Sequence, residues 1–152
     1  MIYADTSLLL PIYVPEENSD KANGAVEGAE ELLISDLTVA ELLVGLARKV
    51  KLGSLTTEKA EHVRAIFEQH MAEGYLQRIP LSGHHSEAAG QIAFQSPVML
   101  RTLDAIHLAV AVEHAATIAT LDVRLSDAAR AIGVEVLPYR TPSPGTQGDA
   151  LG

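Results

Sequence analysis

Four acidic residues stand at points of the chain where a helix is expected to begin. Asp5 follows the apolar segment 2–4, Glu41 lies in SDLTVAELL, Asp104 in RTLDAIHLA and Asp122 in ATLDVRL. Carboxylates are the oxygen ligands that Mg²⁺ and Mn²⁺ prefer, and these ions commonly work with substrate phosphates. If the four side chains meet, the chemistry open to them is metal-assisted hydrolysis of a phosphodiester bond.

Strand-like and helical segments alternate along the chain, and these elements must position the acids. Strands are expected at 2–4, 32–34, 76–79, 117–120 and 134–137, and helices at 8–13, 18–28, 39–50, after Thr56, within 84–95, at 101–114 and at 124–133. This alternation predicts an α/β fold, a three-layer α/β/α sandwich with a short, mostly parallel sheet. Residues 1–140 are expected to form one domain, and the Pro, Gly and polar residues of 141–152 predict a disordered tail.

The topology of such a sheet gives the four acids a common location. Ligand sites of parallel sheets lie beyond the carboxyl ends of the strands, where helix N-termini also gather. Asp5 and Asp122 directly follow strands, and Glu41 is one turn into the helix after the second strand. Asp104 begins a helix that must run antiparallel to the strand it feeds, so it is expected at the same edge. Four clustered carboxylates would repel one another, and a divalent cation removes that penalty.

Each acid also has a purely structural explanation. Asp5 and Asp122 fit the role of helix N-caps, and Thr38 with Glu41 fits a T-x-x-E capping box. Asp104 is favoured near a helix N-terminus, but its helix is almost wholly apolar and is expected to be buried all round, where a charge needs compensation. The alternative function is therefore a non-catalytic protein-binding module whose acidic rim docks a basic partner.

Composition narrows the class of protein further. A chain of 152 residues, 47% of them hydrophobic, has the size and character of one globular domain. The absence of cysteine excludes disulfides and thiolate zinc sites, which fits a cytoplasmic protein. No signal-peptide pattern and no apolar run of membrane-spanning length is visible, so we expect a soluble protein without a membrane partner.

The net charge of −9 is unevenly distributed. Residues 1–47 hold one base and nine acids, a net of −8, whereas residues 48–152 hold ten bases and eleven acids, a net of −1. The later part therefore has enough Lys and Arg to form a local positive surface. Five of these bases could grip RNA phosphates or simply be solvated: Arg48, Lys49, Lys51, Arg101 and Arg124.

The order and spacing of four segments resemble one known family. These segments are YADTSLLL at the start, LTVAELLVGLARKVKLGSL in the first third, TLDAIHLAVA, and IATLDVRLSDAARAIGVEV near the end. Together they are similar to PIN-domain ribonucleases, and specifically to the VapC toxins of bacterial toxin–antitoxin pairs. The resemblance covers nearly all of residues 1–137.

The resemblance implies roles for particular side chains. The family's acidic quartet matches Asp5, Glu41, Asp104 and Asp122. Of these catalytic positions, the three aspartates are expected to hold Mg²⁺ or Mn²⁺. Ser7 and Thr120 match small polar positions beside the first and last acids, where they would orient a carboxylate or a bound water. Ser7 could equally be only a helix-start hydroxyl.

The resemblance also implies an activity and partners. Such proteins cut RNA with Mg²⁺ or Mn²⁺, often at one site in a tRNA or ribosomal RNA. They are usually homodimers that a cognate antitoxin holds inactive, often by bringing a basic side chain to the acidic pocket.

His107 is a separate candidate, because it lies one turn after Asp104. A general base is one role for it. On so apolar a helix, however, a packed histidine with a local hydrogen bond is the favoured interpretation, and the family pattern assigns His107 no catalytic part.

Overall fold

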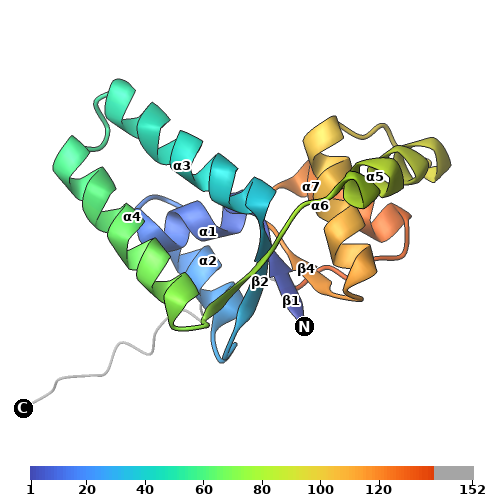
Figure 1. Ribbon diagram of the computed structural model, residues 1–152, viewed down its shortest axis with the longest axis horizontal. Helices are drawn as coiled ribbons and strands as arrows, with labels where there is room; N and C mark the ends of the chain where they lie inside the picture. Colours follow the sequence, from blue (N-terminus) through green and yellow to red (C-terminus); the bar gives the residue numbers. More distant parts are fainter. Residues whose placement is uncertain (139–152) are drawn as a thin grey trace, which may run out of the picture.

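A parallel sheet of four strands runs through the centre of the computed structural model, which describes residues 1–138 (Figure 1). Its strands are β1 (Ile2–Ala4), β2 (Leu32–Ser35), β3 (Leu76–Ile79) and β4 (Thr117–Ala119), in the order β3-β2-β1-β4. Every neighbouring pair is parallel, and Tyr3 of β1 stands opposite Leu33 on one side and Ile118 on the other. The predicted α/β sandwich with a parallel sheet is confirmed.

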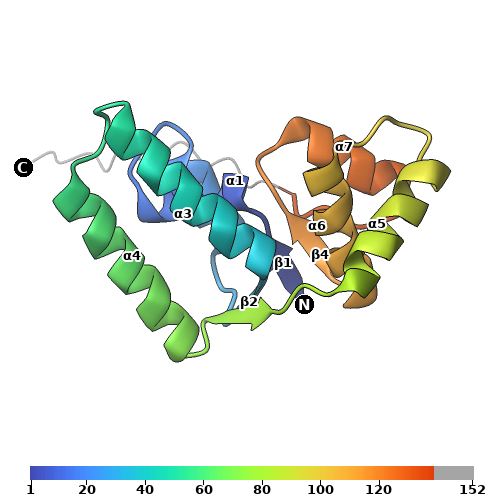
Figure 2. The same cartoon turned by 45° about the horizontal axis from the view of Figure 1, so that its top comes forward.

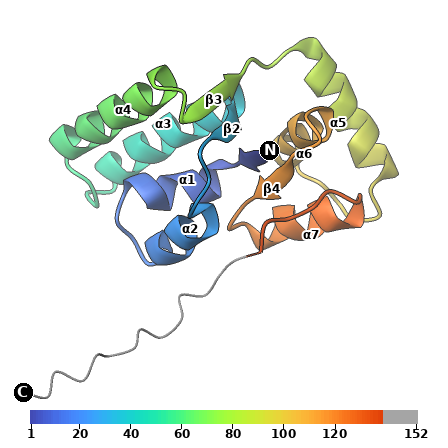
Figure 3. The ribbon, with the colours of Figure 1, turned by 90° about the horizontal axis from the view of Figure 1, so that it is seen from below.

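Seven helices within residues 1–138 cover the two faces of this sheet (Figure 3). They are α1 (Thr6–Tyr13), α2 (Ser19–Val26), α3 (Asp36–Lys51), α4 (Thr57–Ala72), α5 (Gly83–Gln95), α6 (Thr102–Glu113) and α7 (Val123–Ala131). Helices α1 to α4 lie on one face and α5 to α7 on the other. None of the helices described is long and apolar enough to cross a bilayer.

Alternation along the strands explains why two helical layers form. Successive strand residues point to opposite faces. Ala4 and Ile34 therefore pack into the core shared with α1, α3 and α4, which contains the fully buried Phe67. Tyr3 and Ile118 point into the second core, with α6 and α7. The central strand β1 and its neighbour β2 are accordingly apolar up to Ser35, whereas β3, at the edge of the sheet, carries the exposed Gln77 and Arg78.

The start of α3 differs from the capping box expected at Thr38 and Glu41. The helix begins at Asp36, and Ser35, the last residue of β2, caps it with a side chain that accepts from Thr38 N. Thr38 is the third helical residue, and its hydroxyl accepts from Ser35 N at 3.3 Å. The predicted box was wrong because strand and helix are joined without a loop, so the cap falls three residues earlier. Glu41 therefore takes no part in capping α3.

Two other expectations also fail. Residues 134–137 do not form a strand, since only an isolated parallel bridge joins Val136 to Ile118. The bridge consists of two backbone hydrogen bonds, from Ile118 N to Glu135 O and from Leu137 N to Ile118 O, each 2.8 Å long. Helix α6 is not buried all round, since Leu103 and Val112 are exposed. The predicted disordered tail at 141–152 lies outside the described residues.

Candidate active site

Asp5 occupies a buried, closely hydrogen-bonded position directly after β1. It is only 5% exposed and caps α1, with Oδ1 accepting from Leu8 N at 3.2 Å. Ser7 Oγ donates to Oδ1 at 2.8 Å, and Thr120 Oγ1 donates to Oδ2 at 2.8 Å. Burial raises the pKa of Asp5, while the neighbouring His107 and the hydrogen bonds from Ser7, Thr120 and Leu8 work in the opposite direction. Asp5 is therefore both a cap and a carboxyl group whose charged form is penalised.

Ser7 and Thr120 also connect Asp5 to the turn after β4. Their hydroxyl oxygens lie 3.0 Å apart, and Ser7 Oγ accepts from Leu121 N at 2.8 Å and from Asp122 N at 3.1 Å. Thr120 Oγ1 accepts from Asp122 N at 3.1 Å as well. Two hydroxyls thus fix the first acid and the backbone that carries the last one. Ser7 is more than a helix-start hydroxyl.

Asp122 lies at the same edge and is the N-cap of α7. Its Oδ1 accepts from Arg124 N at 2.8 Å and from Leu125 N at 3.3 Å. Within residues 1–138 its other oxygen, Oδ2, forms no hydrogen bond. The capping role predicted for Asp122 is confirmed, and it leaves one carboxylate oxygen free.

Asp104 lies in the first turn of α6, close enough to Asp122 for their charges to interact. Burial raises the pKa of Asp104, and the like charge of Asp122 raises it further. The cationic groups of Arg101 and Arg124, together with His107, lower it. Two carboxylates and two guanidinium groups therefore lie near one another on this part of the rim.

Glu41 is held by side chains from two other elements. Its Oε1 lies 2.6 Å from His107 Nε2 and accepts from Thr6 Oγ1 at 3.2 Å. His107 is only 3% exposed, and its Nδ1 lies 2.6 Å from the Tyr3 hydroxyl. The histidine is packed, as expected, but its hydrogen bonds are long-range instead of local. Residues three apart lie on the same face of a helix, so the position of His107 relative to Asp104 was the sequence feature that indicated a side chain directed toward the acids.

A fifth acid at the same edge escaped the reasoning from sequence. Asp36, at the start of α3, accepts from Arg78 Nε at 2.5 Å and from Leu81 N at 2.9 Å. The hydrogen bond from Leu81 and the contact with Arg78 lower the pKa of Asp36. This carboxylate is already engaged, and it fastens the end of β3 to α3.

The bases of the α3 C-terminus do not reach the acids. Arg48, Lys49 and Lys51 lie in the last turn of α3, whereas Glu41 lies in its second turn. At 1.5 Å of rise per residue they are roughly 10–15 Å further along the helix axis. Lys49 instead pairs with Glu16 at 2.6 Å.

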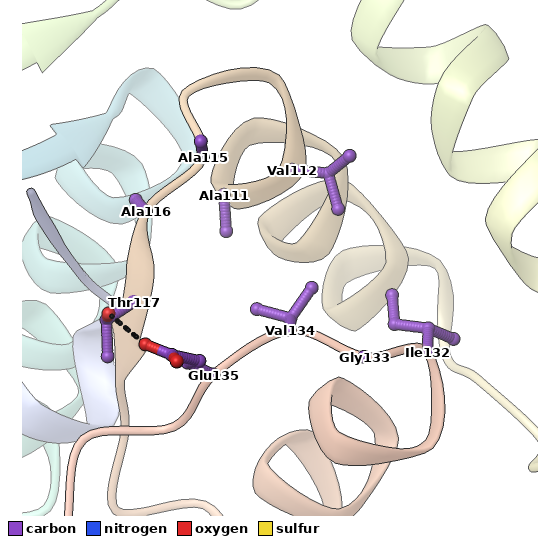
Figure 4. A pocket seen from close by; sticks show the side chains of 9 residues that line it. All are labelled: Ala111, Val112, Ala115, Ala116, Thr117, Ile132, Gly133, Val134 and Glu135. Carbon is purple, nitrogen blue, oxygen red and sulfur yellow. Dashed lines mark hydrogen bonds between the residues drawn. The ribbon is translucent and has the colours of Figure 1, made fainter.

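A cavity of about 340 Å³ lies at the opposite edge of the sheet, beside the amino end of β4 (Figure 4). It lies among residues from the ends of α6 and α7, and Val134 and Ile132 are prominent in its wall. Its one carboxylate, Glu135, accepts from Thr117 Oγ1 at 3.3 Å. This hollow contains none of the four predicted acids.

The donor set at the acidic rim suits a hard cation without forming a complete cage. Among residues 1–138, no three Asp, Glu or His side chains are close enough together to hold a metal ion by themselves. Mg²⁺, however, usually keeps several waters and binds through one or two carboxylates plus substrate phosphates. Burial raises the pKa of Asp5 and of Asp104, and the like charge of Asp122 raises that of Asp104 further, so a cation here would stabilise their charged forms. These residues therefore fit a partly hydrated divalent ion.

Comparison with known proteins agrees with this architecture. Among solved structures, Mycobacterium tuberculosis VapC20, described as a Sarcin-Ricin loop cleaving toxin, is similar with a TM-score of 0.69 at 17% identity, covering 91% of this chain and 100% of that chain. A toxin–antitoxin complex from Klebsiella pneumoniae gives 0.67 at 22% identity, covering 93% and 100%. VapBC2 from Rickettsia felis, bound to a DNA fragment from its promoter, gives 0.65 at 17% identity, covering 92% and 100%.

At these identities the structural likeness shows a shared fold. No match was found among the curated proteins. The family model described as PIN domain matches residues 2–131, which is well over half of the chain. This protein therefore belongs to the PIN domain family.

Proposed function

We propose that this protein is a metal-dependent ribonuclease and the toxin component of a type II toxin–antitoxin system. The observation that carries the proposal is the setting of Asp5, a buried carboxylate clamped by Ser7 and Thr120 at the edge where Asp104 and Asp122 also lie. Burying a carboxylate without a full counter-charge is costly, and a cation at this rim would offset that cost. Membership of the PIN domain family, and the description of VapC20 as a Sarcin-Ricin loop cleaving toxin, support the same conclusion.

In this proposal Asp5, Asp104 and Asp122 hold Mg²⁺ or Mn²⁺. When bound, the ion supplies charge neutralisation at the phosphodiester and lowers the pKa of the attacking water. Ser7 and Thr120 keep Asp5 in one orientation. Glu41 accepts a hydrogen bond from the attacking water.

Positive charge at the rim would hold the RNA backbone. Arg101 and Arg124 act electrostatically on Asp104, so their guanidinium groups lie near enough to bind phosphates flanking the cleaved bond. In the absence of RNA the acids offset the charge of both arginines. When RNA binds, the two side chains would turn from the acids to the phosphates of the substrate. We propose that the substrate is an RNA, such as a tRNA or a ribosomal RNA.

The proposal includes two protein partners. The similar structures include a toxin–antitoxin complex and a VapBC2 assembly, which supports a cognate antitoxin for this chain. A basic antitoxin side chain at the acidic rim would compete with the cation. We also propose that the toxin is a homodimer.

The second candidate is a protein-binding module without catalysis. Asp5 and Asp122 both cap helices, and Glu41 is hydrogen-bonded to His107. Three of the four acids therefore have a structural role that needs no catalysis. A module of this kind would bind its basic partner through the same rim with or without a metal ion.

RNA cleavage separates the two candidates. The antitoxin-free protein is incubated with total cellular RNA and Mg²⁺ or Mn²⁺, with EDTA as the negative control, and cleavage sites are mapped by sequencing the new RNA ends. We expect metal-dependent cuts that Asp104→Asn abolishes and Asp127→Asn preserves, because the Asp127 side chain is 67% exposed and outside the site.

Growth arrest gives the same contrast in cells. Overexpression is expected to halt growth, and Asp104→Asn is expected to relieve the arrest, whereas Asp127→Asn should not. Uncut RNA together with arrest by Asp104→Asn would leave the binding module as the better explanation.

A further inference from the structure

A chain of buried hydrogen-bonding groups connects the end of β2 with Glu41. The Tyr3 hydroxyl lies 2.9 Å from Ser35 Oγ and 2.6 Å from His107 Nδ1. His107 Nε2 in turn lies 2.6 Å from Glu41 Oε1. Tyr3, Ser35 and His107 are all buried, so bulk water does not compete for these contacts. The chain crosses β1 from α6 to α3, which lie on either side of that strand (Figure 2).

The direction of each hydrogen bond follows from the groups involved. An ionised Glu41 carboxylate only accepts, so the proton in that contact belongs to His107 Nε2. Burial raises the pKa of Tyr3, so its hydroxyl keeps its proton, and with the imidazole proton on Nε2 we assign this hydroxyl as the donor to Nδ1. The Ser35 hydroxyl then donates to the Tyr3 oxygen. With Nε2 as donor to Glu41 and Nδ1 as acceptor from Tyr3, every group of the chain has a partner.

Both hydrogen bonds to Glu41 fall on the same carboxylate oxygen. Oε1 accepts from His107 Nε2 and, at 3.2 Å, from Thr6 Oγ1. Oε2 forms no hydrogen bond within the part of the chain that is described, residues 1–138. Because the Glu41 side chain is 30% exposed, this second oxygen remains open to water at the rim.

We propose that His107 is a positioning residue: its Nε2–H, with the tautomer set by Tyr3, fixes Oε1 of Glu41 and leaves Oε2 to orient the attacking water. This inference rests on the proposed nuclease function. A partly exposed glutamate has considerable rotamer freedom, and anchoring one oxygen holds the other in a single orientation before the substrate arrives. His107 itself touches neither the RNA nor the ion.

A matched pair of substitutions separates the two ring nitrogens. In His107→Gln the amide nitrogen stands where Nε2 was and can still donate to Glu41. In His107→Asn the shorter amide stands where Nδ1 was, so it can reach Tyr3 but not Glu41. We expect His107→Asn to lower kcat by about 10–100-fold, the usual effect of losing a group that orients an active-site residue. KM for RNA should change little, and His107→Gln should recover most of kcat.

A double-mutant cycle with Glu41→Gln tests the route of the effect. If His107 acts through Glu41, His107→Asn should cause almost no further loss of kcat once Glu41 is replaced. Equal losses in the presence and absence of Glu41 would overturn the inference, as would equal kcat values for the Gln and Asn variants. Circular dichroism melts check that each variant is folded.

Nuclear magnetic resonance reads the tautomer without any cleavage assay. In ¹⁵N-histidine-labelled, metal-free protein, the ring signals that disappear in His107→Gln identify His107. We expect a protonated Nε2 and an unprotonated Nδ1 in the wild type, and a mixture of tautomers in Tyr3→Phe. A wild-type signal with the proton on Nδ1 alone would overturn the inference even if every variant at position 107 failed to fold.

The two levels of the proposal fail in different ways. If wild-type protein cuts no RNA with Mg²⁺ or Mn²⁺, the nuclease function is wrong whatever the tautomer of His107. If wild-type protein cuts RNA but the Gln and Asn variants behave alike, only the positioning role is wrong.

Discussion

Thr120 Oγ1 donates a 2.8 Å hydrogen bond to Oδ2 of Asp5, although the two residues stand 115 positions apart in the chain. The contact joins the carboxyl ends of the adjacent strands β1 and β4, whose parallel register places Ala4 beside Ala119. The clamp on Asp5 is therefore a product of strand pairing. It is also the feature on which the proposed chemistry depends most directly.

Thr120→Val removes this hydroxyl while keeping the shape of the side chain. We expect RNA cleavage to fall by about 10–100-fold, because Asp5 loses a group that orients it. The free energy of unfolding should fall by about 1–3 kcal/mol, because a buried carboxylate and the backbone N–H of Asp122 each lose a partner. Cleavage rates and urea denaturation measure the two effects.

Thr117→Val is the matched control, because Thr117 stands at the other end of β4 and donates only to Glu135. Its cleavage rate should equal that of the wild type. Equal losses in both variants would mean that the strand, not the clamp, was disturbed.

Asp5→Asn should change how stability depends on pH. Burial raises the pKa of Asp5, so in metal-free protein the folded state keeps a proton that the unfolded chain releases near pH ~3.9. The protonated Asp5 therefore stabilises the folded protein at low pH. This contribution is lost as the pH rises from the pKa of Asp5 in the unfolded chain to its pKa in the folded protein, and it stays lost at higher pH. Asn carries no such proton. Urea midpoints in EDTA should show the variant gaining on the wild type as pH rises, whereas parallel profiles would contradict the buried-carboxylate account.

Mn²⁺ or Mg²⁺ should stabilise the folded protein, because only the folded chain brings the acids together. By mass action the gain is about 2.7 kcal/mol at a free ion concentration of roughly 100 times Kd. Thermal melts with metal and with EDTA measure it. Asp104→Asn should lose most of the gain, and Asp127→Asn should keep it. An identical shift in all three proteins would indicate binding outside the rim.

Asp36→Asn tests whether RNA cleavage needs this fifth acid in addition to Asp5, Glu41, Asp104 and Asp122. Asp36 is bonded to Arg78 and Leu81, so we expect cleavage to continue at close to the wild-type rate. The free energy of unfolding should fall by about 1 kcal/mol. The ion pair with Arg78 is partly exposed, and the hydrogen bond from Leu81 N would be weaker to an amide than to a carboxylate. Abolished cleavage in a folded Asp36→Asn protein would mean that the active rim extends beyond the quartet.

The layered fold, and the edge of the sheet at which Asp5 and Asp122 lie, could be predicted from the amino-acid sequence. Apolar runs of strand length alternate with helical segments, and the order of a parallel sheet sends Asp5 and Asp122 to the same edge. These inferences succeed because they depend on periodicity and chain direction, which are local properties of the sequence.

The hydrogen-bonding partner of each polar side chain, in contrast, became visible only in the folded protein. Glu41 matches a capping box in sequence, yet it is bonded to His107, and Asp36 is consumed by an ion pair with Arg78. Residues 134–137 have the pattern of a strand and form only a bridge. A hydrogen bond depends on distances of a few tenths of an ångström between groups brought together from far apart in the chain. That information exists only after the two layers have packed on the sheet.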